Sequence, residues 1–119
     1  MKYLLIIASD PSLPSPAPGD PEFDAYMQAW SDYTDDLTAA GALVASEALL
    51  PVETATTVRH EDGATQVLDG PFAELKEHLG GFYLIDVDTL DDAIEWARRL
   101  PVGEGAVEVR PIMDLSAFM

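Results

Sequence analysis

Cysteine is absent from the chain, which excludes disulfide bonds, thiolate nucleophiles and zinc sites built on cysteine. Basic residues are scarce: 6 Lys and Arg stand against 22 Asp and Glu, for a formal net charge of -16. Such a chain does not attract phosphate backbones, so we exclude nucleic acid as a partner. The excess of acid fits a solvated surface, and it would equally fit adaptation to high salt.

Long hydrophobic runs are also missing. The apolar run near the start, residues 3–8, is too short for a membrane span or a signal-peptide core, so we expect a cytoplasmic protein with no membrane partner. Phosphate-binding loops, dinucleotide fingerprints and serine-hydrolase motifs are absent too. His60 and His78 lack the spacing of metal ligands, so we expect no metal and no cofactor.

The composition favours one folded domain. The 119 residues have a mass of 12.9 kDa and are 48% hydrophobic, which is enough for a single core spanning residues 1–119.

The first third of the chain predicts a strand, a loop and a helix. Residues 2–9 form a continuous apolar strand, and residues 10–21 form a proline-rich loop that is either a lid or a tolerated insertion. Asp20 is expected to cap a helix with Pro21 in its first turn, and the helix ends near Gly41. Its apolar stripe includes the aromatic residues Phe23, Tyr26 and Trp30, and also Leu37.

The middle of the chain predicts mainly strands. Residues 42–50 favour a strand, although a helix stays possible there. Residues 54–59 and 64–68 are β-prone and flank a turn that ends in Asp-Gly, which predicts a hairpin. Residues 73–81 predict a short helix that Gly80 and Gly81 terminate.

The last third predicts a strand over residues 82–87 and a helix that starts at Thr89 and stops before Pro101. A final strand includes residues 107–111. This order of elements has the split βαβ frame of ferredoxin-like α+β folds, with an inserted β-hairpin. One sheet face then lacks helices, so we expect a homodimer, the alternative being a monomer whose hairpin and proline loop cover that face.

One motif carries a family resemblance. Asp69-Gly70-Pro71-Phe72 precedes AELKE and is followed by GGFYLIDV and DDAIEWARRLP; together they resemble the YCII-related family, and within it the DGPF branch. The resemblance covers about residues 23–112. It implies a dimeric α/β barrel of ferredoxin-like subunits with a pocket between sheet and helix. Some relatives pair a histidine with an aspartate for proton transfer, but Trp30 stands where they have the histidine, so that pair cannot be transferred.

Asp69 is the first candidate catalytic residue. A carboxylate at a strand end can be held by backbone N–H groups while one oxygen faces a pocket, as a general base requires. The alternative is structural, because Asp before Gly-Pro also forms turns and caps helices.

Other candidates accompany it. Glu47 and Glu74 could act as second carboxylates. The candidate ligand-binding residues are Tyr26, Trp30, Phe72, Lys76 and Arg59. The aromatic residues among them could instead form core or interface, and Lys76 could pair with a neighbouring carboxylate. Two hypotheses follow: a small-molecule binding or regulatory domain that uses a cleft of the dimer, or an isomerase or lyase in which Asp69 moves or orients a proton.

Overall fold

The chain folds as an α+β protein in a computed structural model that describes residues 1–13 and 15–119. Residue 14 of the proline-rich loop lies outside the described residues. The elements, in order, are β1 (Lys2–Ser9), α1 (Phe23–Ala39), β2 (Leu43–Ala48), the 3₁₀ turn η1 (Val52–Thr54), β3 (Thr56–Glu61), β4 (Ala64–Asp69), β5 (His78–Asp86), α2 (Leu90–Arg98), β6 (Ala106–Pro111) and the 3₁₀ turn η2 (Leu115–Phe118). No helix among the described residues is long and apolar enough to cross a membrane.

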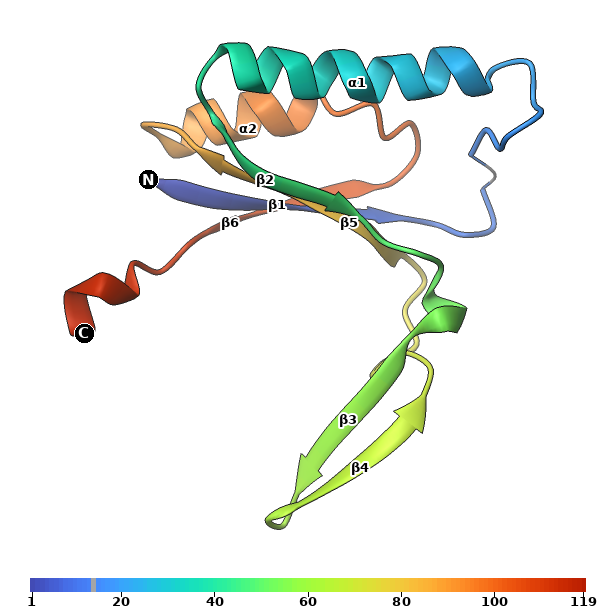
Figure 1. Cartoon of the computed structure of the whole chain (residues 1–119), viewed down its shortest axis with the longest axis vertical. Helices are drawn as coiled ribbons and strands as arrows, with labels where there is room; N and C mark the ends of the chain where they lie inside the picture. The colour runs from blue at the N-terminus through green and yellow to red at the C-terminus, as the bar shows by residue number, and fades with distance from the viewer. Residues whose placement is uncertain (14) are drawn as a thin grey trace.

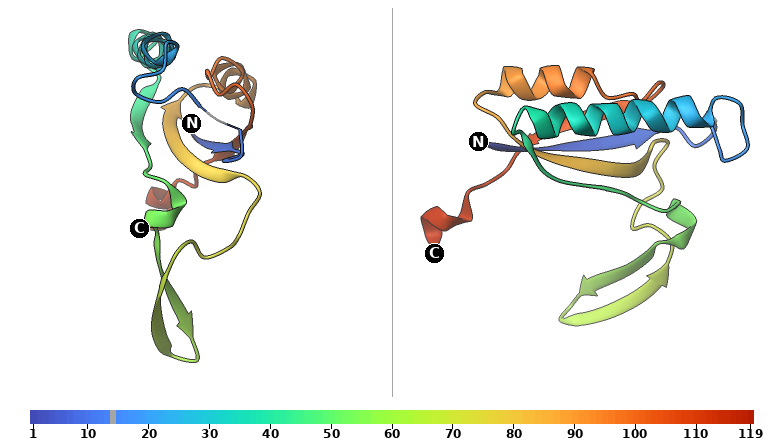
Figure 2. Two further views of the ribbon diagram at one scale, coloured as in Figure 1. Left: turned by 90° about the vertical axis from the view of Figure 1, so that its right-hand side faces the viewer. Right: turned by 45° about the horizontal axis from the view of Figure 1, so that its top comes forward.

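The main sheet has four strands in the order β2-β5-β1-β6, and every neighbouring pair is antiparallel. Both helices lie on the same side of this sheet (Figures 1 and 2). The pair β3-β4 forms a separate two-stranded sheet, which extends away from the main sheet on the side opposite the helices (Figure 1). Within the described part of the chain the main sheet stays open and does not close into a barrel.

The core lies between the sheet and the helices. Alternate residues of the central strands face the helices, so Tyr3 and Leu5 of β1 are buried together with Ile85 of β5. Leu37 of α1 and Ala93 of α2 close over them, and both are fully buried. Burial of apolar area in this single layer is the main source of stability for the domain.

The opposite face of the sheet is apolar along the two central strands, with Glu47 on β2 and Glu108 and Arg110 on β6 at its margins. Leu4 and Ile6 alternate with the core residues of β1, and Phe82 and Leu84 pair with Ile6 and Leu4 on β5. All four are only partly exposed, and no helix covers them in the part of the chain that the structure describes. The domain therefore presents one helical face and one bare apolar face.

A β-bulge interrupts the pairing of the two central strands. Ile7 pairs with Gly81 but Ala8 pairs with Leu79, so Gly80 is the extra residue. Gly81 is buried against β2, where an added Cβ would lie 2.7 Å from the carbonyl oxygen of Glu47. Glycine at this position lets β2 and β5 approach each other.

Two expectations about helices are wrong. Asp20 does not cap α1: its carboxylate accepts a hydrogen bond from the Ala17 N–H and its carbonyl accepts one from Phe23, so a turn precedes the helix and Glu22 is the cap residue. The expected short helix at residues 73–81 is absent, and β5 instead begins at His78. β1 pairs with residues 78–81 along one of its edges, residues 73–77 form a loop, and the glycine pair disfavours a helix.

Other expectations are confirmed. Residues 43–48 form a strand and not a helix. The hairpin forms with its turn at Asp62 and Gly63, both at positive φ. The Thr89 side chain caps α2 by accepting a hydrogen bond from the N–H of Asp92.

The contact at Gly81 gives a stability prediction. We expect Gly81→Ala to lower the free energy of unfolding by about 1–3 kcal/mol, because the new methyl group must displace backbone of β2. Gly80→Ala is the matched control: its Cβ would meet open space, so a change within about 0.5 kcal/mol is expected. Urea denaturation measures both, and equal losses would contradict this role of Gly81.

Candidate functional site

A pocket of about 420 Å³ lies between α1 and the end of the sheet at which the bulge occurs. Its lining comes from both central strands, from β2, from α1 and from the loops at this end. The lining residues are Ile7, Ser9, Ser15, Tyr26, Met27, Trp30, Ser46, Glu47, Ala48, Gly80, Gly81, Phe82, Tyr83 and Val102. This volume is within the range of small-molecule sites.

The pocket exists because small side chains lie beneath large ones. Ser46 and Ala48 of β2 pair with Tyr83 and Gly81, so these four residues share the helix-facing side of the sheet. Three of the four have small side chains or none. Trp30 and its neighbours on α1 therefore span a hollow at this end, whereas Leu37 fills the space near the other end of the helix.

Aromatic rings form one wall. Trp30 stacks on Tyr83 with ring centroids 6.4 Å apart and an interplanar angle of 9°, and Tyr26 meets Trp30 edge-on at 6.3 Å. The Tyr83 hydroxyl lies 2.8 Å from the Thr34 hydroxyl, which satisfies it inside the structure. These contacts fix the ring of Trp30, so the wall is preorganised.

The pocket lacks positive charge. No Lys, Arg or His is among the described residues that line it, and Glu47 is the one carboxylate there. Glu47 pairs with Phe82, so its side chain belongs to the bare face of the sheet, opposite to Ser46. The described residues also contain no cluster of His, Asp and Glu that could hold a metal ion. Apolar and hydroxyl groups therefore dominate this site.

Tyr33, a third aromatic residue of α1, belongs to the core. Its ring packs edge-on against Tyr83 and Trp96, and its hydroxyl donates a hydrogen bond of 2.8 Å to the Trp96 carbonyl. Burial raises the pKa of the Tyr33 phenol, and the neighbouring Tyr83 adds to this shift. The phenol links α1 to α2.

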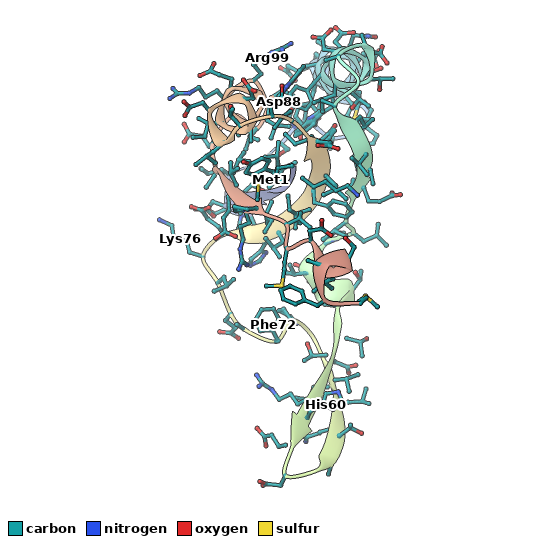
Figure 3. All side chains as sticks on the ribbon, turned by 90° about the vertical axis from the view of Figure 1, so that its left-hand side faces the viewer. Met1, His60, Phe72, Lys76, Asp88 and Arg99 are labelled. Atoms are coloured by element: carbon teal, nitrogen blue, oxygen red, sulfur yellow. The ribbon has the colours of Figure 1, made fainter. Side chains whose placement is uncertain are left out.

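A second hollow, of about 450 Å³, opens at the opposite end of the domain, near Asp88 and Arg99 (Figure 3). Four carboxylates line it, from Asp86, Asp88, Asp92 and Glu95. The Arg99 guanidinium lies 4.4 Å from the centre of the Trp96 ring and 2.7 Å from the Asp36 carboxylate. The one cation and the one ring of this hollow are therefore already engaged, and we take the aromatic pocket as the candidate site.

The Asp69-Gly70-Pro71-Phe72 motif lies at the base of the hairpin, outside the aromatic pocket. The Gly70 N–H donates to the Ala55 carbonyl at 2.8 Å, and the Thr57 hydroxyl donates to the Gly70 carbonyl at 2.7 Å. Arg59 donates to the Phe72 carbonyl at 2.8 Å. These bonds fold the motif back onto β3, so Arg59 has a structural partner in the chain itself.

Asp69 itself is exposed and pairs with Thr56 across the hairpin. Its carboxylate takes part in no hydrogen bond or ion pair recorded for residues 1–13 and 15–119, and no helix follows for it to cap. The motif's backbone makes the turn, and the carboxylate is left free.

The structure brings together only part of the predicted site. Tyr26, Trp30 and Glu47 border the pocket, whereas Arg59, Asp69, Phe72, Glu74 and Lys76 lie on the hairpin and the loop that follows it. Figure 3 shows Phe72 and Lys76 on that loop and His60 on the hairpin. Sequence reasoning missed Ser46, Gly81 and Tyr83, although the run of small residues in β2 and the glycine pair were visible signals of space.

The free carboxylate separates the two interpretations of Asp69. We expect Asp69→Asn to change the free energy of unfolding by no more than about 0.5 kcal/mol, because no bond to the carboxylate is lost. Gly70→Ala should cost about 1 kcal/mol or more, because φ is +93° there. Thermal unfolding of both variants measures this. A large loss for Asp69→Asn would assign Asp69 to the turn.

Comparison with known proteins places the sequence in a family. The family model described as YCII-related domain matches residues 1–116, which is nearly the whole chain. An uncharacterized protein of Rhizobium meliloti (strain 1021) is 41% identical over 115 residues, which cover 94% of this chain and 92% of that protein. The chain therefore belongs to the YCII-related family.

Proposed function

We propose that this protein binds a small, uncharged ring compound in the aromatic pocket between α1 and the sheet. The observation that carries the proposal is the hollow of about 420 Å³, with Trp30 and Tyr26 above Ser46 and Gly81. A flat ring gains most from such a wall through stacking and burial of apolar area.

The lining also indicates which charge the ligand has. Carboxylates and phosphates need a cation or a cluster of N–H donors, and no Lys, Arg or His borders the pocket among the described residues. Ser9, Ser46 and Tyr26 supply hydroxyl groups that can donate or accept. A phenol or a neutral heterocycle has matching groups, and a benzoate does not.

Binding without turnover is the function that the pocket supports best. A proton-transfer enzyme needs an acid and a base within reach of one bound molecule. The pocket borders only Glu47, whose strand position places it on the other face, and Asp69 lies outside it. The isomerase or lyase hypothesis based on Asp69 stays a prediction.

The ligand proposal is tested with phenol and benzoate as probes. Trp96→Phe leaves Trp30 as the one tryptophan, so quenching of its fluorescence reports the pocket. In this background we expect phenol to quench saturably and benzoate to bind at least tenfold more weakly. Ser46→Leu should fill the floor and weaken phenol binding at least tenfold while the protein stays folded by circular dichroism. Equal binding by the Ser46→Leu variant, or preference for benzoate, would contradict the proposal.

We also propose that the protein is a ferredoxin-like subunit of the DGPF branch, folded as one domain over residues 1–119, that pairs with a second copy as a dimeric α/β barrel. The strand order β2-β5-β1-β6 supports the ferredoxin-like assignment. The bare apolar face supports the homodimer, because Ile6, Phe82 and Leu84 gain from being covered. A cytoplasmic location stays a prediction.

The pairing has a direct test. The wild-type chain should have twice its mass of 12.9 kDa in multi-angle light scattering. Leu84→Lys places a charge on the bare face and should shift the mass to that of one chain. Leu90→Lys is the matched control on α2 and should leave the mass unchanged. A monomeric wild type would refute the homodimer, and the pocket measurement would be unaffected.

A further inference from the structure

The segment that follows β6 is folded but lies apart from the body of the domain (Figure 1). The Ile112 N–H donates to the Lys2 carbonyl at 2.9 Å, which fixes where the segment leaves the sheet. The Asp114 carboxylate accepts hydrogen bonds from the hydroxyl and the N–H of Ser116, and both bonds lower the pKa of Asp114. We call residues 113–119 the tail.

The tail exposes large apolar side chains. Met113 is 71% exposed and Phe118 is 79% exposed, and Leu115 is also exposed. The tail descends on the bare side of the sheet, away from the helices (Figures 1 and 2). Large apolar side chains that gather at one exposed place mark an interaction site.

The tail leaves the sheet beside Lys2, at the start of β1. A groove that could take an apolar side chain lies at the other end of β1, beside Ser9. It has a volume of about 170 Å³ and is lined by Ser9, Pro11, Leu49, Leu50, Pro51, Val52, Glu53, His78, Leu79 and Gly80. Leu50 and Leu79 are exposed there. This volume equals that of about six waters at roughly 30 Å³ each, which is the space of one large side chain.

With its 3₁₀ turn kept, the tail falls short of this groove on its own chain. It leaves beside Lys2, whereas the groove begins at Ser9, about 23 Å further along β1 at roughly 3.3 Å per residue. The path from Ile112 through the 3₁₀ turn to Phe118 spans only about 16 Å. A folded tail therefore meets such a groove more readily on a second copy than on its own chain.

We propose that the tail of one copy docks in the groove of a second copy, with Phe118 inserted between the leucine side chains. This inference rests on the proposed homodimer. A two-fold axis between the bare faces and across the strands brings the Lys2 end of one copy over the Ser9 end of the other. Both tails then dock at once, so each groove of the dimer is filled and no site is left for a third chain.

Charge favours a second copy at this place. Two chains of net charge -16 repel each other, so they meet where carboxylates are few. The tail carries one side-chain carboxylate, at Asp114, and the groove is lined by one, at Glu53. By contrast, α1 carries four aspartates, at positions 24, 32, 35 and 36.

The cysteine-free chain allows a clean crosslinking test. One full-length variant carries Met119→Cys and another carries Glu53→Cys at the groove, so Phe118 and the leucine side chains are kept; they are mixed and oxidised. We expect a disulfide between residues 119 and 53 of different chains, identified by mass spectrometry, at a yield at least tenfold above that with Leu90→Cys as the matched control on α2. Adding Phe118→Asp to the first variant should reduce the yield to the control value.

Each other outcome counts against docking in trans. If the mixture is dimeric by light scattering but the yield equals the control, the tail proposal fails and the homodimer stands. If a chain with both cysteines crosslinks only within itself, the tail docks on its own chain and the proposal is wrong. If the wild type is monomeric, both the homodimer and the tail proposal fail. Quenching by phenol, read on the same variants with Trp96→Phe added, reports the pocket independently.

Discussion

Both helices lie on one face of the main sheet, and this one-sided arrangement determines what the rest of the molecule can do. Each helix connects strands that do not pair with each other, β1 with β2 and β5 with β6, and each packs on the same layer. That layer contains the whole buried core. The aromatic pocket is the part of this layer that α1 spans without filling. Because both helices cover one face of the sheet, the other face is left bare.

The pocket exists because the strands beneath this part of α1 lack large side chains. Trp30 and Tyr26 would pack against larger side chains as an ordinary core, as Leu37 does further along the same helix. Ser46 and Ala48 on β2 and the glycine pair on β5 prevent that. The bulge contributes because its extra residue, Gly80, also borders the hollow. The glycine pair therefore contributes both to the bulge in β5 and to the space of the pocket.

Much of the fold could be predicted because its signals are local. Apolar runs gave β1 and β5, helical spacing gave α1, and the Thr89 cap gave the start of α2. The two wrong predictions also have physical causes. Residues 73–81 have a helical composition, but β1 offers the backbone of residues 78–81 a partner that is far away in the sequence. Asp20 resembled a cap, but its carboxylate is satisfied by the preceding turn.

The candidate site was harder to predict than the fold. Tyr26 and Trp30 were identified from helical spacing, because residues on one side of a helix meet one surface. That Asp69 and Arg59 lie outside the pocket depends on the direction of the hairpin, which no local pattern encodes. The hydrogen bonds from Thr57 and Arg59 to the motif backbone show why those residues occur together.

The sequence separation of these contacts also sets an order of folding. The bonds that close the hairpin join residues only 13 apart, so this unit has low contact order and can form as soon as it is synthesised. β1 is made early, yet its partners β5 and β6 begin at His78 and Ala106. The central strand must therefore wait with both edges open, and during translation it is the segment most exposed to wrong pairing.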